Sequence, residues 1–472
     1  MAADPALAER LAAQLAADPT AEARDAEVNQ VLARAWRSFY RGDIRRAEAV
    51  FRQQATHAED VPGAPATALL GLALIAHWEG RSAEAADLAE QVCALSPNYA
   101  TPHYALGEIE WARGNPEAAE AALRRALAIA PSHIDARIVL GNLALERGAY
   151  REGWSLLEAR TLRRGYDSWA NTFTSYQPWA GEPLDGRTIL LPSEQGLGDQ
   201  LQVARYAPIL AARGGRVIVE TRPPLARLFR TLAGVEQVIT TDEVKARRGP
   251  PWRPSVEPID VWAYPMSLPG VFDTTLETIP PCPYVRADPE LVDAWRPRIR
   301  PGPALKVGLV WAGNPRSPTP GGRAGWGDSL RHLSLEALAP LGRVPGVTLY
   351  SLQVRRRDPA PPGLTVLDLA PWLDDFAETA AAIANLDLVI SVDTSVANLV
   401  GALGAPGWIL LPRPCEWRWL RDGDTTPWYP SLRLFRQERR GEWGPVVERV
   451  AAELGKLVAE RGAGMRPALG VA

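Results

Sequence analysis

Cysteine is scarce in this chain of 472 residues, which has only Cys93, Cys282 and Cys415, far apart in sequence. Their spacing suits no metal site, and we expect reduced thiols instead of a disulfide framework. The formal net charge of -3 leaves no basic footprint for nucleic acid. No apolar run approaches the roughly 18 residues of a membrane span. The first residues mix acids with arginine, unlike a secretory signal. We expect a cytoplasmic protein that binds no nucleic acid and has no membrane span.

The composition that remains, 46% hydrophobic and 23% charged, is ordinary for globular protein. A chain of this length is too long for one core, so two to four domains are expected. No GxSxG elbow and no Walker-type loop is present, which argues against a serine hydrolase and a P-loop enzyme.

The first third of the chain repeats with a period of 34 residues. Gly80, Gly114 and Gly148 each follow a helical stretch at this interval, and an earlier unit turns at Gly42. The same interval separates Pro97 from Pro131, Ala85 from Ala119, and Leu72 from Leu106 and Leu140. Two short amphipathic helices joined at glycine are typical of a tetratricopeptide repeat. We predict an α-solenoid over residues 1–165.

Small alanines let the paired helices of each repeat approach closely, while leucines fill the seam between them. One repeat cannot bury its apolar face alone, so neighbouring repeats must stack into a superhelix with a groove. Such grooves usually bind protein or peptide, which is the partner we expect. The alternative is that the array only extends the fold or mediates self-association.

Strands and helices alternate from about residue 186 onward. "RTILLPSE", "RVIVET" and "VEQVIT" have the apolar runs of strands, and "DQLQVARYAPILAARG" has the pattern of a helix. A second alternating block begins at "ALKVGLVWAGNP" and includes "LSLEALAPLGRV" as a helix. This order predicts two Rossmann-like domains with parallel sheets, at 186–300 and 303–460, as in a GT-B fold. The tail 461–472 is predicted to be disordered.

A Gly-x-Gly turn joins the first predicted strand to its helix in "SEQGLGDQLQVARY". Gly196 and Gly198 allow a sharp turn with close backbone approach. The preceding Glu194 and Gln195 either touch a donor or acceptor or serve the structure alone. Asp199 stands at the helix N-terminus, where the dipole favours its ionised form. It is a candidate general base for an acceptor hydroxyl, or only a helix cap.

Two further strand ends carry candidate phosphate-binding groups. One lies in "DLVISVDTSVANLVGALG", where backbone N–H groups and hydroxyls at a helix start either hold a diphosphate or only cap the helix. The other lies in "VWAGNP" and is followed by an arginine, which either neutralises phosphate charge or is a solvated surface group. The residues concerned are Gly313, Asn314, Arg331, Asp393, Thr394 and Ser395.

Aromatic and imidazole side chains add weaker candidates. Trp417 and Trp419 lie in a loop-rich stretch and either stack on a nucleobase or sugar or belong to the core, as is commoner for tryptophan. His332 is the histidine nearest the predicted site, and it has no partner at a spacing that would suit a metal.

The chain from residue 186 to about 445 resembles the heptosyltransferase-type glycosyltransferases of family 9, in the version fused behind tetratricopeptide repeats in bacteria. The matching stretches, in the family's order, are EQGLGDQLQVARYAP, MSLPGVFDTTLETIP, VGLVWAGNP, SLQ, DFAETAAAIANLDLVISVDTSVANLVGALG, WRWL, TPWYP and LRLFRQ. Some repeat-fused relatives resemble flagellin glycosyltransferases, in which the repeats recruit the protein acceptor. The resemblance implies a GT-B enzyme that moves a sugar from a nucleotide-activated donor to a hydroxyl.

The resemblance also implies roles for individual residues. Asp199 matches the proposed catalytic base, Asp393 and Thr394 match the contacts to the donor's phosphates, and Arg331 matches the arginine after the "GNP" strand. Transfer would be inverting and metal-independent, with the nucleotide sugar as substrate and no covalently bound cofactor.

The chain departs from the family pattern at several places. Asn398 stands where the family usually has histidine, and it can donate a hydrogen bond to the donor but carries no charge. Val354 stands where lysine is usual, with Arg355 next along, and "RSPTPGGRAGWGD" is longer than usual. The departures leave a second hypothesis, a non-catalytic scaffold with a degenerate GT-B body whose repeats bind protein. The donor, the acceptor and the oligomeric state stay open.

Overall fold

Glycines in the left-handed region join the helices of the N-terminal repeats: Gly42, Gly80, Gly114 and Gly148 have φ of 87°, 79°, 83° and 84°. Glycine adopts this conformation without strain, so the residue that marks the 34-residue period is the one that the turn requires. The computed structural model describes residues 23–57, 63–163, 166, 176–246, 259–299, 301–313, 331–354, 356 and 358–462.

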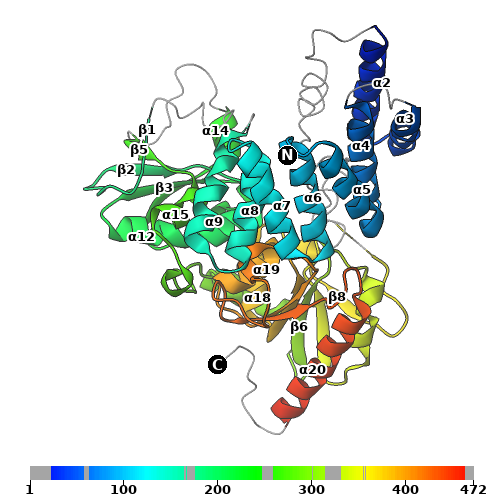
Figure 1. Ribbon diagram of the computed structural model, residues 1–472. Helices are drawn as coiled ribbons and strands as arrows, with labels where there is room; N and C mark the ends of the chain where they lie inside the picture. Colours follow the sequence, from blue (N-terminus) through cyan, green and yellow to red (C-terminus); the bar gives the residue numbers. More distant parts are fainter. Residues whose placement is uncertain are drawn as a thin grey trace. The chain divides into compact units, whose positions relative to one another are not determined.

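Eight helices of the described chain belong to the glycine-linked pairs. They are α2 (Ala23–Tyr40), α3 (Ile44–His57), α4 (Ala64–Trp78), α5 (Ser82–Leu95), α6 (Ala100–Arg113), α7 (Pro116–Ile129), α8 (Ile134–Glu146) and α9 (Tyr150–Leu157). Successive helices from α2 to α7 lie side by side, in blue to cyan (Figure 1). The repeat alanines Ala85 and Ala119 are fully buried, Leu72 and Leu140 are buried, and Leu106 is partly buried. The seam therefore has the residue types that close helix packing needs.

The described chain divides into two compact units, the helices up to Leu143 and the chain from Ala144 onward. The boundary falls inside α8, so α9 belongs with the α/β part. A short 3₁₀ helix, η1 (Glu158–Leu162), follows α9. The predicted domain bounds 1–165, 186–300 and 303–460 stay predictions. No described helix has the length and apolar character to cross a membrane.

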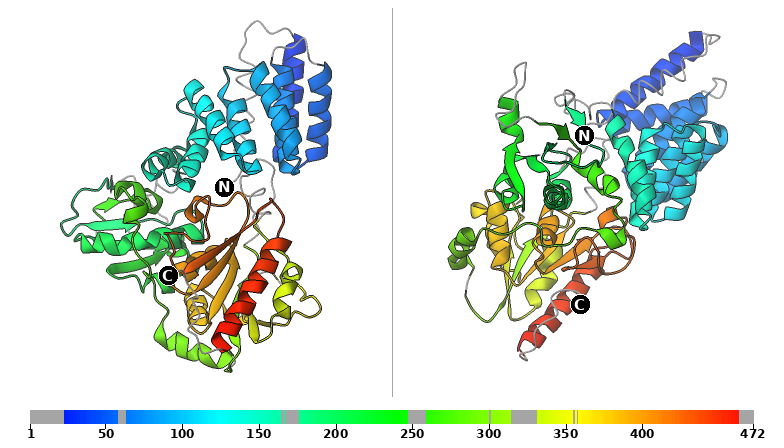
Figure 2. Two further views of the ribbon diagram at one scale, coloured as in Figure 1. Left: turned by 60° about the horizontal axis from the view of Figure 1, so that its bottom comes forward. Right: turned by 90° about the vertical axis from the view of Figure 1, so that its left-hand side faces the viewer.

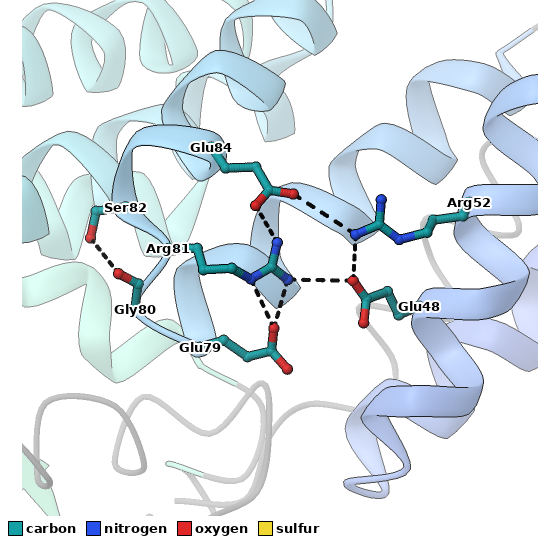
Figure 3. Close-up of polar contacts among 7 residues, drawn as sticks. All are labelled: Glu48, Arg52, Glu79, Gly80, Arg81, Ser82 and Glu84. Carbon is teal, nitrogen blue, oxygen red and sulfur yellow. Dashed lines mark hydrogen bonds and ion pairs between the residues drawn. The ribbon is translucent and has the colours of Figure 1, made fainter.

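An ion-pair network ties two repeats together around the turn between α4 and α5 (Figure 3). The Arg81 guanidinium donates to Glu79 at 2.6 Å and to Glu84, and it lies 3.4 Å from Glu48 on α3. Arg52 on α3 pairs with Glu48 at 2.7 Å. The hydrogen bond to Glu84, then that to Glu79, raises the pKa of Arg81 above its ordinary value. Arg81 is therefore shared among three carboxylates, two of which also lie near Arg52.

We expect Arg81→Met to lower the thermal midpoint of the repeat unit because three neighbouring carboxylates lose their shared cation. The pairs are partly exposed, so the loss is about 1 kcal/mol. It should shrink from 0.1 M to 1 M salt, as the Debye length falls from about 10 Å to about 3 Å. Arg124→Met is the matched control, since Arg124 forms an i,i+4 pair with Glu120 at 2.7 Å within one helix. A loss that ignores salt, or an equal loss in the control, contradicts the network.

The first α/β half is a five-stranded parallel sheet with strand order β1-β5-β2-β3-β4. Its strands are β1 (Gln177–Pro178), β2 (Thr188–Leu191), β3 (Arg216–Thr221), β4 (Val235–Thr240) and β5 (Val261–Trp262). Its helices are α11 (Leu197–Val203), η2 (Ala204–Tyr206), α12 (Ala207–Ala212), α13 (Pro223–Phe229) and α14 (Thr241–Ala246). Leu190, Ile218 and Ile239 come from the neighbouring strands β2, β3 and β4 into one buried cluster.

Several short helices follow the first sheet. They are η3 (Pro265–Ser267), α15 (Leu268–Val271), η4 (Leu276–Thr278), α16 (Pro289–Trp295) and η5 (Arg296–Arg298).

The second α/β half is a six-stranded parallel sheet of order β11-β10-β9-β6-β7-β8. Its strands are β6 (Leu305–Val310), β7 (Val347–Ser351), β8 (Val366–Asp368), β9 (Leu388–Val392), β10 (Gly407–Leu411) and β11 (Leu432–Arg436). Its helices are η6 (Leu335–Arg343), η7 (Ala370–Trp372), α18 (Phe376–Ala384), α19 (Ser395–Ala402), η8 (Trp417–Trp419) and α20 (Gly444–Gly462). The apolar face of α20, red in Figure 2, packs on this sheet through Val447, Val450 and Leu454.

Helical repeats followed by two parallel α/β sheets confirm the predicted fold class, an α-solenoid with a GT-B body of two Rossmann-like halves. Two predicted helices differ in detail. The helix expected over 199–214 is divided into α11, η2 and α12, and "LSLEALAPLGRV" forms the 3₁₀ helix η6. Pro208 at the start of α12 and Pro340 inside η6 cannot donate a backbone hydrogen bond, which explains both differences. Residues 463–472 of the predicted tail lie outside the described residues.

All three cysteines are free thiols. Burial raises the pKa of Cys93 to about 11 and that of Cys415 to about 12, and it also raises the pKa of Cys282. The Cys415 thiol also donates a hydrogen bond to Leu420 O at 3.4 Å.

We expect iodoacetamide at pH 8 to label Cys93 slowly in the folded chain and readily after unfolding. A thiol with a pKa near 8.5 holds roughly two hundred times more thiolate at this pH than one at about 11. The folded state keeps the proton in this interval, so stability should also fall as the pH rises from about 8.5 to 11. The fall should be smaller in Cys93→Ala. Fast labelling of the folded chain contradicts the burial of this thiol.

Candidate functional site

Asp199 lies in the first turn of α11, directly after the glycine turn that follows β2. Its Oδ2 accepts a hydrogen bond from the Gly196 backbone N–H at 3.0 Å, so Asp199 is the N3 residue of a capping box whose N-cap is Gly196. Its Oδ1 accepts a second, charged hydrogen bond from Arg418 Nη2 at 2.6 Å. Asp199 is thus both a cap and one half of an ion pair, and the cap alone does not account for its contacts.

The second predicted turn lies between β9 and α19. Thr394 is the N-cap of α19, and its Oγ1 accepts from the Ala397 N–H at 3.5 Å and contacts Ser391 Oγ at 3.1 Å. The first turn of a helix leaves backbone N–H groups, here those of Ser395 and Val396, without intrahelical acceptors. Asp393, directly before the N-cap, is buried. The arrangement leaves backbone donors for a ligand.

The two turns meet, although they come from different sheets. A Cβ on Gly198 would lie 3.4 Å from the Ser395 Cα and 2.9 Å from Asn398 Nδ2. Helix α11 therefore packs on α19 only because residue 198 has no side chain. The close approach brings together candidates that are about two hundred residues apart in sequence.

Arg418, which the sequence analysis missed, connects these groups. Its side chain is only 6% exposed, and besides Asp199 it donates from Nη1 to Asn398 Oδ1 at 3.1 Å. Burial alone would lower the pKa of Arg418, but the Asp199 carboxylate, with Glu416 and Asp393, outweighs it and raises the pKa. Arg418 therefore stays protonated beside three carboxylates.

Asn398 serves the same network from α19. Its Oδ1 also accepts from Tyr429 OH at 3.0 Å, and its Nδ2 donates to Thr394 O at 3.0 Å. The side chain is buried, so a direct bond to a donor would require these contacts to open. Its predicted donor contact stays a prediction.

Glu416 lies on the exposed side of the site. Its carboxylate is 3.9 Å from Arg418 Nη2, and its side chain is 52% exposed. The protein that surrounds it raises its pKa, and the nearby Asp393 and Asp199 carboxylates raise it further, against the effect of Arg418 and Arg331. Arg331, predicted to neutralise phosphate, is therefore within electrostatic range of this group.

The end of β6 contributes the third predicted element. A Cβ on Gly313 would lie 3.4 Å from His332 Nε2 and 3.8 Å from Thr394 Cγ2, so Gly313 adjoins the α19 turn. Gln353 Oε1, after β7, accepts from the backbone N–H groups of Trp311 and Ala312 at 3.2 and 2.9 Å. This bond fixes the β6 end.

Asn314 and Arg355 lie outside the described residues. Val354 is 41% exposed, as an apolar residue where the family usually has lysine.

The two tryptophan candidates face protein. The Trp417 ring packs edge-on against Trp154 and Trp428, each at 5.2 Å between centroids. Trp419 is fully buried near Tyr429. The rings hold η8 in place and so present Arg418, while stacking on a ligand stays a prediction. The "WRWL" motif lies at this site, but Arg418, between the two tryptophans, makes the polar contacts.

Glu194 and Gln195, directly before the glycine turn, make hydrogen bonds to other parts of the protein. Glu194 is buried and accepts from Arg160 Nε at 2.9 Å and from the Met266 N–H at 2.8 Å. Gln195 has φ 58°, and its carbonyl accepts from Arg222 Nη2 at 2.6 Å. In the described residues, no His, Cys, Asp and Glu gather as a group that could hold a metal ion.

Comparison with known proteins begins with the repeats. Residues 101–143 match the family model of the tetratricopeptide repeat. Protein FlbA of Caulobacter vibrioides is 30% identical over 334 residues, which are 66% of this chain and 53% of that protein. The chain thus spans about half the length of this curated relative.

Two solved structures are similar at low identity. A Thermobaculum terrenum O-GlcNAc transferase mutant has 16% identity and a TM-score of 0.34, over 94% of this chain and 93% of that one. A family 9 glycosyl transferase from Veillonella parvula has 12% identity and a TM-score of 0.40, over 60% of this chain and all of that one. Scores this low add no weight to the assignment of function.

Proposed function

We propose that the chain is a glycosyltransferase that moves a sugar from a nucleotide-activated donor to a hydroxyl acceptor. The supporting observation is the contact of the Asp199 turn with the α19 N-terminus, 3.4 Å from the Gly198 Cβ position to Ser395. The proposed transfer requires a base and a phosphate-binding site close together. Asp199 of the first α/β half and the N-terminus of α19 in the second would supply them. The resemblance to family 9 enzymes over residues 186 to 445 points the same way.

In the proposed reaction, the Asp199 carboxylate takes the proton of the acceptor hydroxyl. The acceptor oxygen attacks the anomeric carbon from the face opposite the leaving group, so the configuration inverts. The bond from this carbon to the phosphate oxygen breaks, and the nucleoside diphosphate leaves with the electron pair. The α19 N-terminus, with Arg331 and Arg418, stabilises the charge of the leaving group. Arg331 and Arg418 would thus neutralise the charge on the leaving diphosphate in place of a metal ion.

The acceptor in this proposal is a protein or peptide held by the repeats. Their support is the tetratricopeptide match at residues 101–143 and the general use of stacked repeats as binding surfaces. We propose a cytoplasmic location, in keeping with three cysteines that form no disulfide.

The test is calorimetry and thermal shift of the whole chain with UDP, GDP, ADP, CMP and their sugar conjugates. Saturable binding of one nucleotide, abolished in Asp393→Ala, would support the donor site and identify its class. Hydrolysis or transfer of that donor by the wild type but not by Asp199→Ala would support the base. The absence of any binding at millimolar nucleotide would contradict the enzyme.

A non-catalytic scaffold is the second candidate, and the observation that favours it is Asn398. The amide that replaces the usual histidine is neutral and is engaged with Thr394, Arg418 and Tyr429. A scaffold would bind no nucleotide in the same screen, yet the repeats would still retain a protein partner. Nucleotide binding with donor turnover would rule it out.

A further inference from the structure

The segment formed by α9 and η1, residues 150–162, makes polar contacts behind the Asp199 turn. Arg160, at its end, has a side chain only 4% exposed, and its Nε donates to Glu194 Oε1 at 2.9 Å. Glu194 is itself 3% exposed. The ion pair is therefore buried. In this low-dielectric environment the charged hydrogen bond is strong and restricts the positions of both side chains.

Each remaining donor of Arg160 also has a protein acceptor. Nη1 donates to Glu158 Oε1 at 2.6 Å, and Nη2 donates to Ser267 Oγ at 2.7 Å. Glu194 is fixed from other sides by the Met266 N–H and by Tyr166 OH. The pair thus anchors one fixed point of the chain, five residues before Asp199.

The backbone between this anchor and Asp199 has little freedom. Gln195 is in the left-handed region at φ 58°, which costs a non-glycine residue about 1 kcal/mol or more. Its carbonyl is held by Arg222 at 2.6 Å, and the next N–H, of Gly196, is bonded to Asp199 Oδ2. A strained backbone conformation persists only where neighbouring contacts hold it. The buried contacts of Glu194 hold the residue directly before Gln195.

We propose that Arg160 is a positioning residue, which sets the place of the Asp199 carboxylate by holding Glu194. The proposal rests on the proposed function for its effect on rate, but not for its effect on structure. Arg160 lies on η1, directly after the last helix of the repeat pairs, so a contact from that segment reaches Glu194, five residues before the proposed base. A carboxylate displaced by about 1 Å can cost about 100-fold in rate.

The experiment compares wild type with Arg160→Met, Arg160→Lys and the double variant Arg160→Met with Glu194→Gln. The double variant removes both charges, and the Gln carbonyl can still accept from the Met266 N–H. Arg151→Met is the matched control, because Arg151 lies on α9 of the same segment and pairs with Asp273 at 2.8 Å on the surface. The readouts are kcat and KM for the donor, thermal midpoint, and amide hydrogen exchange of residues 194–199.

We expect Arg160→Met and the double variant to lower kcat by about 100-fold with KM unchanged, and to speed exchange in residues 194–199. Arg160→Lys should recover part of both, and Arg151→Met should behave as wild type. Wild-type kcat and exchange in a folded double variant would show that the pair serves stability alone, and would overturn the proposal. So would an equal loss in Arg151→Met.

Failure of the proposed function is distinguishable in the same experiment. A wild-type chain that transfers no sugar from any donor would refute the glycosyltransferase. The exchange comparison needs no turnover, and it then decides by itself whether Arg160 holds the Asp199 turn.

Discussion

Asp199→Asn is expected to lower kcat about a thousandfold while nucleotide binding stays within the range of wild type. A general base contributes about 10²–10⁴-fold, and an amide takes no proton from an acceptor hydroxyl. Asparagine is nearly isosteric, and its oxygen can still accept from the Gly196 N–H or from Arg418, so the helix cap is retained in part. The measurement is single-turnover transfer from the donor that the calorimetric screen identifies.

Asp375→Asn is the matched control for this prediction. Asp375 caps α18 and pairs with Arg227 at 3.1 Å, so it has the same two structural roles as Asp199 at another helix. Its replacement should leave kcat unchanged, with a small loss of stability. Comparable rates in Asp199→Asn and wild type would remove Asp199 from the chemistry and leave it as a cap and ion-pair partner.

Local sequence predicted most of the strands because their signals are local. "RVIVET" and "VEQVIT" correspond to β3 and β4 at the predicted residues, since each is an apolar run that begins after a glycine. The short strands β1 and β5 have two residues each, too few for any periodicity. They form because β5 pairs with β2, a neighbour about seventy residues earlier in the chain.

The turns of the candidate site were also predictable, because glycine and a capping residue identify a strand-to-helix turn. Gly198 and Thr394 show this, and the structure brings their turns together. The ion pairs that arginines form with the residues of the Asp199 turn were not predictable. Arg418 meets Asp199 across 219 positions, and Arg160 meets Glu194 across 34. A single sequence carries no signal for such pairs, since lone arginines usually lie on the surface.

Arg418→Met is expected to destabilise the α/β unit by about 3–5 kcal/mol, the usual cost of breaking a buried ion pair from one side. Methionine fills most of the volume but leaves the Asp199 carboxylate without its cation and Asn398 without a donor. The measurement is the urea or thermal transition followed by tryptophan fluorescence, since Trp417, Trp419 and Trp428 surround the substituted residue.

Arg227→Met supplies the contrast for this prediction, because Arg227 also connects the two α/β halves, through Asp375 and Glu378 at 3.1 Å each. Its side chain is 44% exposed, against 6% for Arg418. Water screens the exposed pair, so its loss should be about 1 kcal/mol or less. Adding Asp199→Asn to Arg418→Met should restore part of the stability, because the uncompensated carboxylate is then gone. Equal losses in the two arginine variants would mean that burial does not strengthen the Asp199–Arg418 pair, and that the halves are held by packing between α11 and α19.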